Sequence, residues 1–245
     1  TQSPQKLFKT GNFTKVPLII GNLNGEGILL YSCLKFNDSI YELMNKRPDW
    51  AVPMNWNINS ETTRILIGEL IKYKFFDGKL LTKRSINKIV NVYSDTYFLM
   101  NLDHSVSAYL KHSQFPIYNY EMVYEPIVSY IKLRTVMTQK DLFSYRGAAH
   151  ADEITLLFST KFLPLVGRDK YVSEKMITMW TNFAKTGNPN SPNSNIIWRK
   201  LEKDNRSYLE IGRILNIKEG RVKQERLMFW EDLCQKINID YPCYF

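Results

Sequence analysis

Two residues of this sequence, His150 and Glu26, have settings that suit acid–base chemistry. His150 lies in a run of small residues, RGAAHADE at 146–153, just before the apolar run 154–158. Small neighbours leave an imidazole ring accessible, and a general base must reach a nucleophile on one side and an orienting carboxylate on the other. The segment therefore predicts a candidate general base at the end of a sheet element. Because a lone histidine in a loop is more often structural, that alternative stays open.

Glu26 is the candidate carboxylate. It stands between Gly25 and Gly27, directly after the apolar run VPLIIG at 16–21 and the residues NLN. That run predicts a buried strand of the parallel-sheet type, and sites in open α/β sheets form at the carboxyl ends of such strands. Glycines on both sides suggest a backbone that aims the carboxylate into a site. A solvated glutamate in a glycine-rich turn is the equal alternative.

The remaining histidines and the cysteines give no further site. His104 and His112 lie eight residues apart in helix-like sequence, with no zinc-ligand spacing around them, and are interpreted as polar surface residues. The three cysteines are too few for a disulfide framework, and their odd number leaves at least one free or paired outside this chain. We therefore expect no metal and no cofactor. The cysteines are Cys33, Cys234 and Cys243.

The elements that must position Glu26 and His150 alternate along the chain. The hydrophobic patterns predict strands at 16–21, 115–122, 208–211 and 213–217, and helices at 28–34, 61–76, 85–100, 170–186 and 221–237. The strand 115–122 alternates apolar and polar residues after its proline. The helix 61–76 is predicted to bury the face Ile65, Leu66, Leu70, Ile71 and Phe75. Strands interleaved with helices indicate an α/β layered fold.

Composition excludes two classes of function. The net charge is +9, but between residues 199 and 226 nine Lys/Arg are interleaved with five Asp/Glu, which is typical of a mixed solvated surface. We therefore expect no nucleic-acid binding. No window approaches eighteen consecutive apolar residues, so no membrane span is predicted. A chain of 245 residues, 44% hydrophobic, suits one globular domain or a large piece of one.

Several segments together resemble the type-B carboxylesterase and cholinesterase family. Within that family, the sequence is most similar to insect esterases. The segments are 16–27, 93–98, 116–120, 147–153, 179–189, Trp198 and 226–230, and they stand in the family's order. The resemblance implies an α/β-hydrolase fold, a mostly parallel sheet flanked by helices. Residues 1–245 would form the C-terminal part of one such domain.

By this resemblance, Glu26 is the acid and His150 the base of a catalytic triad, in the order that α/β-hydrolases follow. The resemblance also suggests an ion pair between Asp95 and Arg226. Phe98 and Met100 are candidates for the wall of the substrate pocket, with core packing as the alternative.

The nucleophile is the large departure from the family pattern. None of the sixteen serines has a glycine two residues away on both sides, as a Gly-x-Ser-x-Gly turn requires, and none of the cysteines does either. We expect the nucleophile and the oxyanion segment to lie upstream of Thr1, so that this chain alone is inactive. The full-length protein is expected to hydrolyse a small-molecule carboxylic ester to an alcohol and a carboxylate.

Three other functions are compatible with part of the pattern: a non-catalytic adhesion or binding protein of the same fold, an inactive fragment, and a lipid or hormone carrier. The resemblance favours a secreted protein, although intracellular relatives exist. Three N-glycosylation triplets, beginning at Asn12, Asn37 and Asn205, agree with the secretory route.

Overall fold

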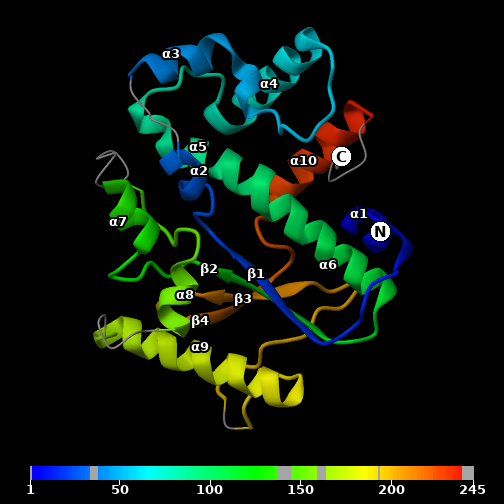
Figure 1. Cartoon of the computed structure of the whole chain (residues 1–245), viewed down its shortest axis with the longest axis vertical. Helices are drawn as coiled ribbons and strands as arrows, with labels where there is room; N and C mark the ends of the chain where they lie inside the picture. Colours follow the sequence, from blue (N-terminus) through cyan, green and yellow to red (C-terminus); the bar gives the residue numbers. More distant parts are fainter. Residues whose placement is uncertain (1, 34–37, 137–144, 159–163, 193, 239–245) are drawn as a thin grey trace.

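A four-stranded sheet runs through the middle of the molecule (Figure 1). The computed structural model describes residues 2–33, 38–136, 145–158, 164–192 and 194–238. The strands stand in the order β1-β2-β3-β4. The first three are parallel and the last is antiparallel to its neighbour. Their bounds are β1 Leu18–Leu23, β2 Ile117–Met122, β3 Ser207–Ile211 and β4 Leu215–Glu219.

The boundary of β1 differs from the prediction, and β2 is buried along its whole length. Strand β1 extends two residues further than expected, because Asn22 and Leu23 pair with Glu121 and Met122 of β2. All six residues of β2 are buried, including the polar residues of the alternation that the sequence shows along this strand. Both faces of this central strand are covered, which is the usual situation of a parallel strand.

Helices cover both faces of the sheet. Helix α9 (Gly167–Thr186) packs its apolar side chains on one face, next to the buried Trp198. Helices α1 (Pro4–Thr10) and α6 (Met100–His112) cover the other face, with Tyr109 and Val106 in the contact. In Figure 1 these helices lie on opposite sides of the strands.

A third core is built mainly from helices. The helices that build it are α2 (Ile28–Cys33), α3 (Asp38–Lys46), η1 (Pro48–Ala51), α4 (Glu61–Phe76), η2 (Lys83–Ser85), α5 (Ile86–Ser94) and α10 (Gln224–Lys236). Its centre includes Trp56 and Trp230, whose rings meet edge to face at 6.1 Å. The shorter α8 (Asp152–Leu157) packs beside α9, and α7 (Tyr130–Val136) lies between α8 and α2 (Figure 1).

Helix α4 forms where it was predicted, but its predicted buried face is only partly right. Leu66 and Leu70 are 62% and 50% exposed, whereas Ile67 and Ile71 are buried. The reason is η1, which packs so closely that a Cβ at Gly68 would lie 2.3 Å from the carbonyl oxygen of Pro48. The glycine therefore turns that side of the helix inward.

The predicted helix at 85–100 is part of a longer continuous helix with a change of winding in it. Helix α5 passes into a π-helical turn, η3 (Asp95–Leu99), and then into α6. Beneath this turn the predicted ion pair is present: Arg226 Nη2 lies 2.9 Å from Asp95 Oδ1. The carboxylate of Asp95 is fully buried and also accepts a hydrogen bond from Trp230 Nε1 at 3.1 Å.

Candidate active site

Glu26 is presented by a tight turn at the carboxyl end of β1. This acid turn, residues 24–27, continues the sheet because the Asn24 amide donates to the carbonyl of Met122 at 3.0 Å. A Cβ at Gly25 would lie 2.6 Å from the carbonyl oxygen of Ala148, and one at Gly27 would lie 2.2 Å from that of Val90. The two glycines flanking Glu26 therefore permit close backbone approach on both sides.

His150 lies in a second turn, residues 147–151, which packs directly on the acid turn. The Gly25 amide donates to the Ala148 carbonyl at 2.9 Å, and the Asn24 side chain accepts from the Ala148 amide at 2.8 Å. Directly after His150, Ala151 adopts the left-handed conformation, with φ of 68°. This histidine turn is thus held by backbone pairing. The apolar run after it forms helix α8.

The two turns bring Glu26 and His150 into direct contact across 124 positions of sequence. Glu26 Oε2 lies 2.6 Å from His150 Nδ1, a length typical of a charge-assisted hydrogen bond. The other carboxylate oxygen, Oε1, accepts from the Leu23 amide at 2.9 Å. The Glu26 side chain is 6% exposed and that of His150 is 40% exposed. A buried carboxylate therefore orients a ring that can still reach a reactant.

The contact changes the acid–base behaviour of the histidine. The hydrogen bond from the ring to Glu26 raises the pKa of His150 above its ordinary value, and partial burial opposes this rise. Because Nδ1 faces the carboxylate, Nε2 is the nitrogen left to accept a proton from a nucleophile. This is the arrangement that a general base needs.

Two further carboxyl groups next to His150 were not singled out in the sequence. Asp152 accepts from the Ala149 amide at 2.8 Å and so closes the histidine turn, and its burial raises its pKa to about 6. Glu153 is largely buried, which raises its pKa, and its Oε2 has no hydrogen-bond partner among the described residues. An aspartate two residues after the histidine, at a helix start, is the signal that could have indicated the first of these.

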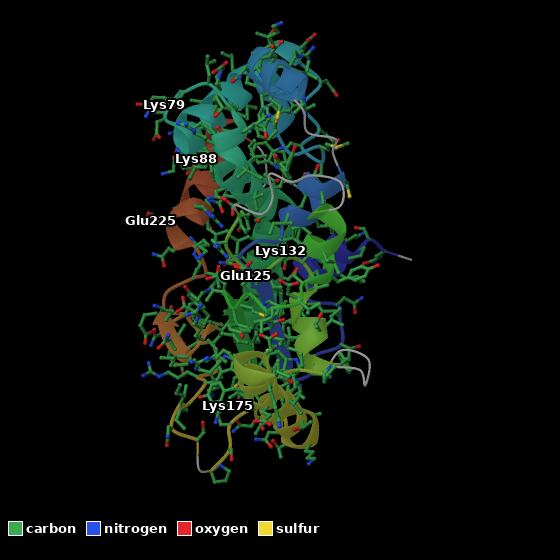
Figure 2. All side chains as sticks on the ribbon, turned by 90° about the vertical axis from the view of Figure 1, so that its left-hand side faces the viewer. Lys79, Lys88, Glu125, Lys132, Lys175 and Glu225 are labelled. Atoms are coloured by element: carbon green, nitrogen blue, oxygen red, sulfur yellow. The ribbon has the colours of Figure 1, made fainter. Side chains whose placement is uncertain are left out.

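An ion pair braces the outer side of the histidine turn. Lys132 pairs with Glu125, and the two side chains lie together at mid-height in Figure 2. Lys132 Nζ also donates to the carbonyl of Gly147 at 2.6 Å, while the Gly147 amide donates to Glu125 at 3.3 Å. Gly147 has a φ of 141°, which a residue with a side chain rarely adopts.

The two candidate pocket residues lie in different surroundings. The ring of Phe98 is half-buried and lies 5.2 Å from the ring of His150, at an interplanar angle of 46°. Met100 is 2% exposed and belongs to the helical core. Phe98 is therefore next to the reactive group, whereas Met100 packs in the interior.

The other two histidines lie on helix α6. His104 and His112 are both half-buried, so the expectation of polar surface residues is met only in part, and burial lowers the pKa of His104. Within the described residues, no three His, Cys, Asp or Glu side chains gather closely enough to hold a metal ion. Cys33 is exposed and Cys234 is buried. Cys243 and Asn37 lie outside the described residues.

A mostly parallel sheet flanked by helices, with a carboxylate and a histidine in contact at one edge, is the arrangement found in α/β-hydrolases. The chain belongs to the carboxylesterase family, whose model matches residues 1–230. It is 27% identical over 219 residues to juvenile hormone esterase of Tribolium castaneum, covering 82% of this chain and 35% of that protein. It is also 27% identical over 244 residues to carboxylesterase 4A of Bos taurus, covering 95% and 40%.

A solved structure gives the same fold. Juvenile hormone esterase from Manduca sexta, with OTFP covalently attached, superposes with a TM-score of 0.73 at 18% identity, covering 96% of this chain and 44% of that one. The present chain thus spans less than half the length of these relatives. In the part of the chain that the structure describes, no helix is long and apolar enough to cross a membrane.

Proposed function

We propose that the protein is a serine carboxylesterase in which Glu26 and His150 are the acid and the base of the triad. The observation that carries this proposal is the 2.6 Å contact between Glu26 Oε2 and His150 Nδ1, with the histidine exposed on its other side. No serine of the sequence stands in a Gly-x-Ser-x-Gly turn, so the nucleophile belongs to a further part of the protein. The greater length of the relatives agrees with this.

The reaction follows from the roles of the two residues. A serine hydroxyl attacks the ester carbonyl while His150 Nε2 takes its proton, and the buried Glu26 stabilises the imidazolium that forms. The imidazolium then gives the proton to the departing alcohol. In the second half-reaction, a water loses its proton to His150 and attacks the acyl-enzyme, and the imidazolium returns the proton to the serine oxygen as the carboxylate product is released. Phe98 would contact the substrate next to the imidazole.

The test is ester hydrolysis by the full-length protein. The wild type should hydrolyse a chromogenic ester such as p-nitrophenyl acetate, and His150→Ala should abolish nearly all turnover. His112→Ala is the matched control, because it removes a histidine that lies on α6, away from Glu26, and it should keep the wild-type rate. No hydrolysis by a folded wild type would instead indicate a binding protein of the same fold.

We also propose that the protein enters the secretory route. Asn12 and Asn205 each begin a glycosylation triplet, and both side chains are exposed. Expression through a secretory pathway should therefore give glycosylated protein, whose mass falls on treatment with peptide N-glycosidase F. A protein without glycan at both positions would contradict this.

A further inference from the structure

The helix that passes the acid–histidine pair changes its winding at that point. The Met100 amide donates to the carbonyl of Asp95, five residues earlier, which makes the turn Asp95–Leu99 π-helical. The carbonyl oxygen of Tyr97 accepts a hydrogen bond from Nδ2 of the Asn101 side chain at 3.0 Å. Single π turns within α-helices are uncommon and are found frequently at functional sites.

Ser94, directly before the π turn, holds the acid turn. Its Oγ donates to the carbonyl of Val90 at 2.8 Å and accepts from the amide of Gly27 at 2.9 Å. Gly27 follows Glu26 in the chain, and Ser94 is 3% exposed. A hydroxyl fixed on the helix therefore fixes the backbone that carries the acid.

Phe98, within the π turn, reaches the other member of the pair. Its ring centroid lies 5.2 Å from that of His150, within the range in which aromatic rings interact. Residues four apart on a helix share a face, so Ser94 and Phe98 project toward the same region. One contacts the acid turn and the other contacts the histidine ring.

The π turn is also held on its other side, by helix α10. Asp95 pairs with Arg226 and accepts from Trp230, both on α10. The residues from Val92 to Thr96 are all buried, so the helix is enclosed on every side at this point. A helix fixed on its far side can hold the two side chains on its near side steady.

We propose that Ser94 and Phe98, spaced by the π turn Asp95–Leu99, are the positioning residues of the Glu26–His150 pair. Ser94 sets the place of the acid and Phe98 sets the orientation of the imidazole ring. As regards catalysis this rests on the proposed function, but the geometry can be tested without any hydrolysis. Deleting one residue of the turn would change the angle between Ser94 and Phe98 about the helix axis by about 100°.

The direct test is a histidine titration followed by NMR, which is simple because the chain has three histidines. The charged groups that face His150 are Glu26, Asp152 and Glu153, and none of them is altered. In wild type the pKa of His150 should lie above its ordinary value. Ser94→Ala and Phe98→Leu should each lower it by about half a unit or more, toward about 6.5, because the short hydrogen bond to Glu26 lengthens.

Thr96→Val is the matched control. Thr96 is buried on the same helix and its hydroxyl donates to the carbonyl of Val92 at 2.9 Å, so its loss should leave the pKa of His150 unchanged. Deletion of Tyr97 should act like the two test variants. If the deletion variant does not fold, as judged by circular dichroism, the pKa of His150 in Ser94→Ala and Phe98→Leu decides whether the positioning role holds.

The kinetic test uses the full-length protein. Ser94→Ala should lower kcat about ten- to a hundredfold with little change in KM, because a displaced catalytic group costs turnover and not binding. The acidic limb of the pH–rate profile should move to lower pH by the amount that the pKa of His150 falls. Ser94→Thr should restore both kcat and the position of the acidic limb.

An unchanged pKa of His150 in folded Ser94→Ala and Phe98→Leu would overturn the positioning role. Lowered pKa values in a protein whose wild type hydrolyses no ester would support that role and refute the proposed function. The two proposals therefore fail separately.

Discussion

The molecule contains two acid–base pairs of similar contact distance that differ in their place in the fold and in the exposure of the base. Glu26 and His150 meet at the carboxyl ends of the strands, where the base is 40% exposed. Asp95 and Arg226 meet between two helices, where the acid is 0% and the base 21% exposed. Each joins residues more than a hundred positions apart at a distance below 3 Å.

The difference between the pairs lies in what the base can do. The guanidinium of Arg226 stays charged at all ordinary pH values, and its carboxylate partner is enclosed with Trp230. The imidazole of His150 can take up and release a proton near neutral pH, and its second nitrogen is left for another group. A buried acid beside a permanent cation holds structure together, whereas a buried acid beside an accessible histidine can support catalysis.

The largest effect, on kcat, is expected from a substitution that breaks the Glu26–His150 pair. In the full-length protein, Glu26→Gln should lower kcat by about 10⁴-fold, because the amide no longer stabilises the imidazolium or its correct tautomer. The measurement is kcat on a chromogenic ester, with thermal unfolding to show that the fold is retained. Turnover within tenfold of wild type would show that Glu26 is not the triad acid.

Breaking the Asp95–Arg226 pair should lower the stability of the fold and not alter the catalytic step directly. Arg226→Ala leaves the buried carboxylate of Asp95 without its cation and should lower the free energy of unfolding by about 3–5 kcal/mol. Urea denaturation gives the value. The double variant Asp95→Asn with Arg226→Met keeps an acceptor for Trp230 and removes both charges, so it should recover most of the loss.

A smaller effect is expected where the two regions touch. Gly27→Ala places a Cβ 2.2 Å from the carbonyl oxygen of Val90, so either the acid turn or α5 must move, at a cost of about 1–3 kcal/mol. Gly212→Ala is the control, since its Cβ would meet its neighbours at 3.3 Å. Equal urea midpoints for the two variants would argue against close packing of the acid turn on the helix.

The smallest effect is the dependence of stability on pH. The folded state raises the pKa of His150, so the pair stabilises the protein fully below about pH 6.5 and loses this contribution as pH rises through the folded pKa. His150→Ala should therefore cost more stability at pH 5.5 than at pH 9, by about 0.2–1 kcal/mol, since the ring is partly exposed. Burial raises the pKa of Asp95 to about 6, so the folded state holds this proton more tightly than the unfolded state and stability falls as pH rises from about 4 to 6.

The sequence predicted the fold class and most of the elements because local patterns specify them. Every predicted helix and strand forms, with boundary shifts of a few residues, and the small-residue turns around Glu26 and His150 were recognisable from residue type alone. The predicted contact between Asp95 and Arg226 is confirmed by the structure and came from the family resemblance, since no spacing rule connects positions so far apart.

Only the tertiary structure decided which faces are buried and which side chains meet. The apolar residues of α4 occur on more than one side, so the sequence could not show that Leu66 and Leu70 stay exposed while η1 covers the side with Gly68. Ser94 gives no local signal at all, because its role depends on Gly27 lying next to it. Periodicity specifies the elements of this protein, whereas the contact between Glu26 and His150 exists only because parallel strands carry their turns to one edge of the sheet.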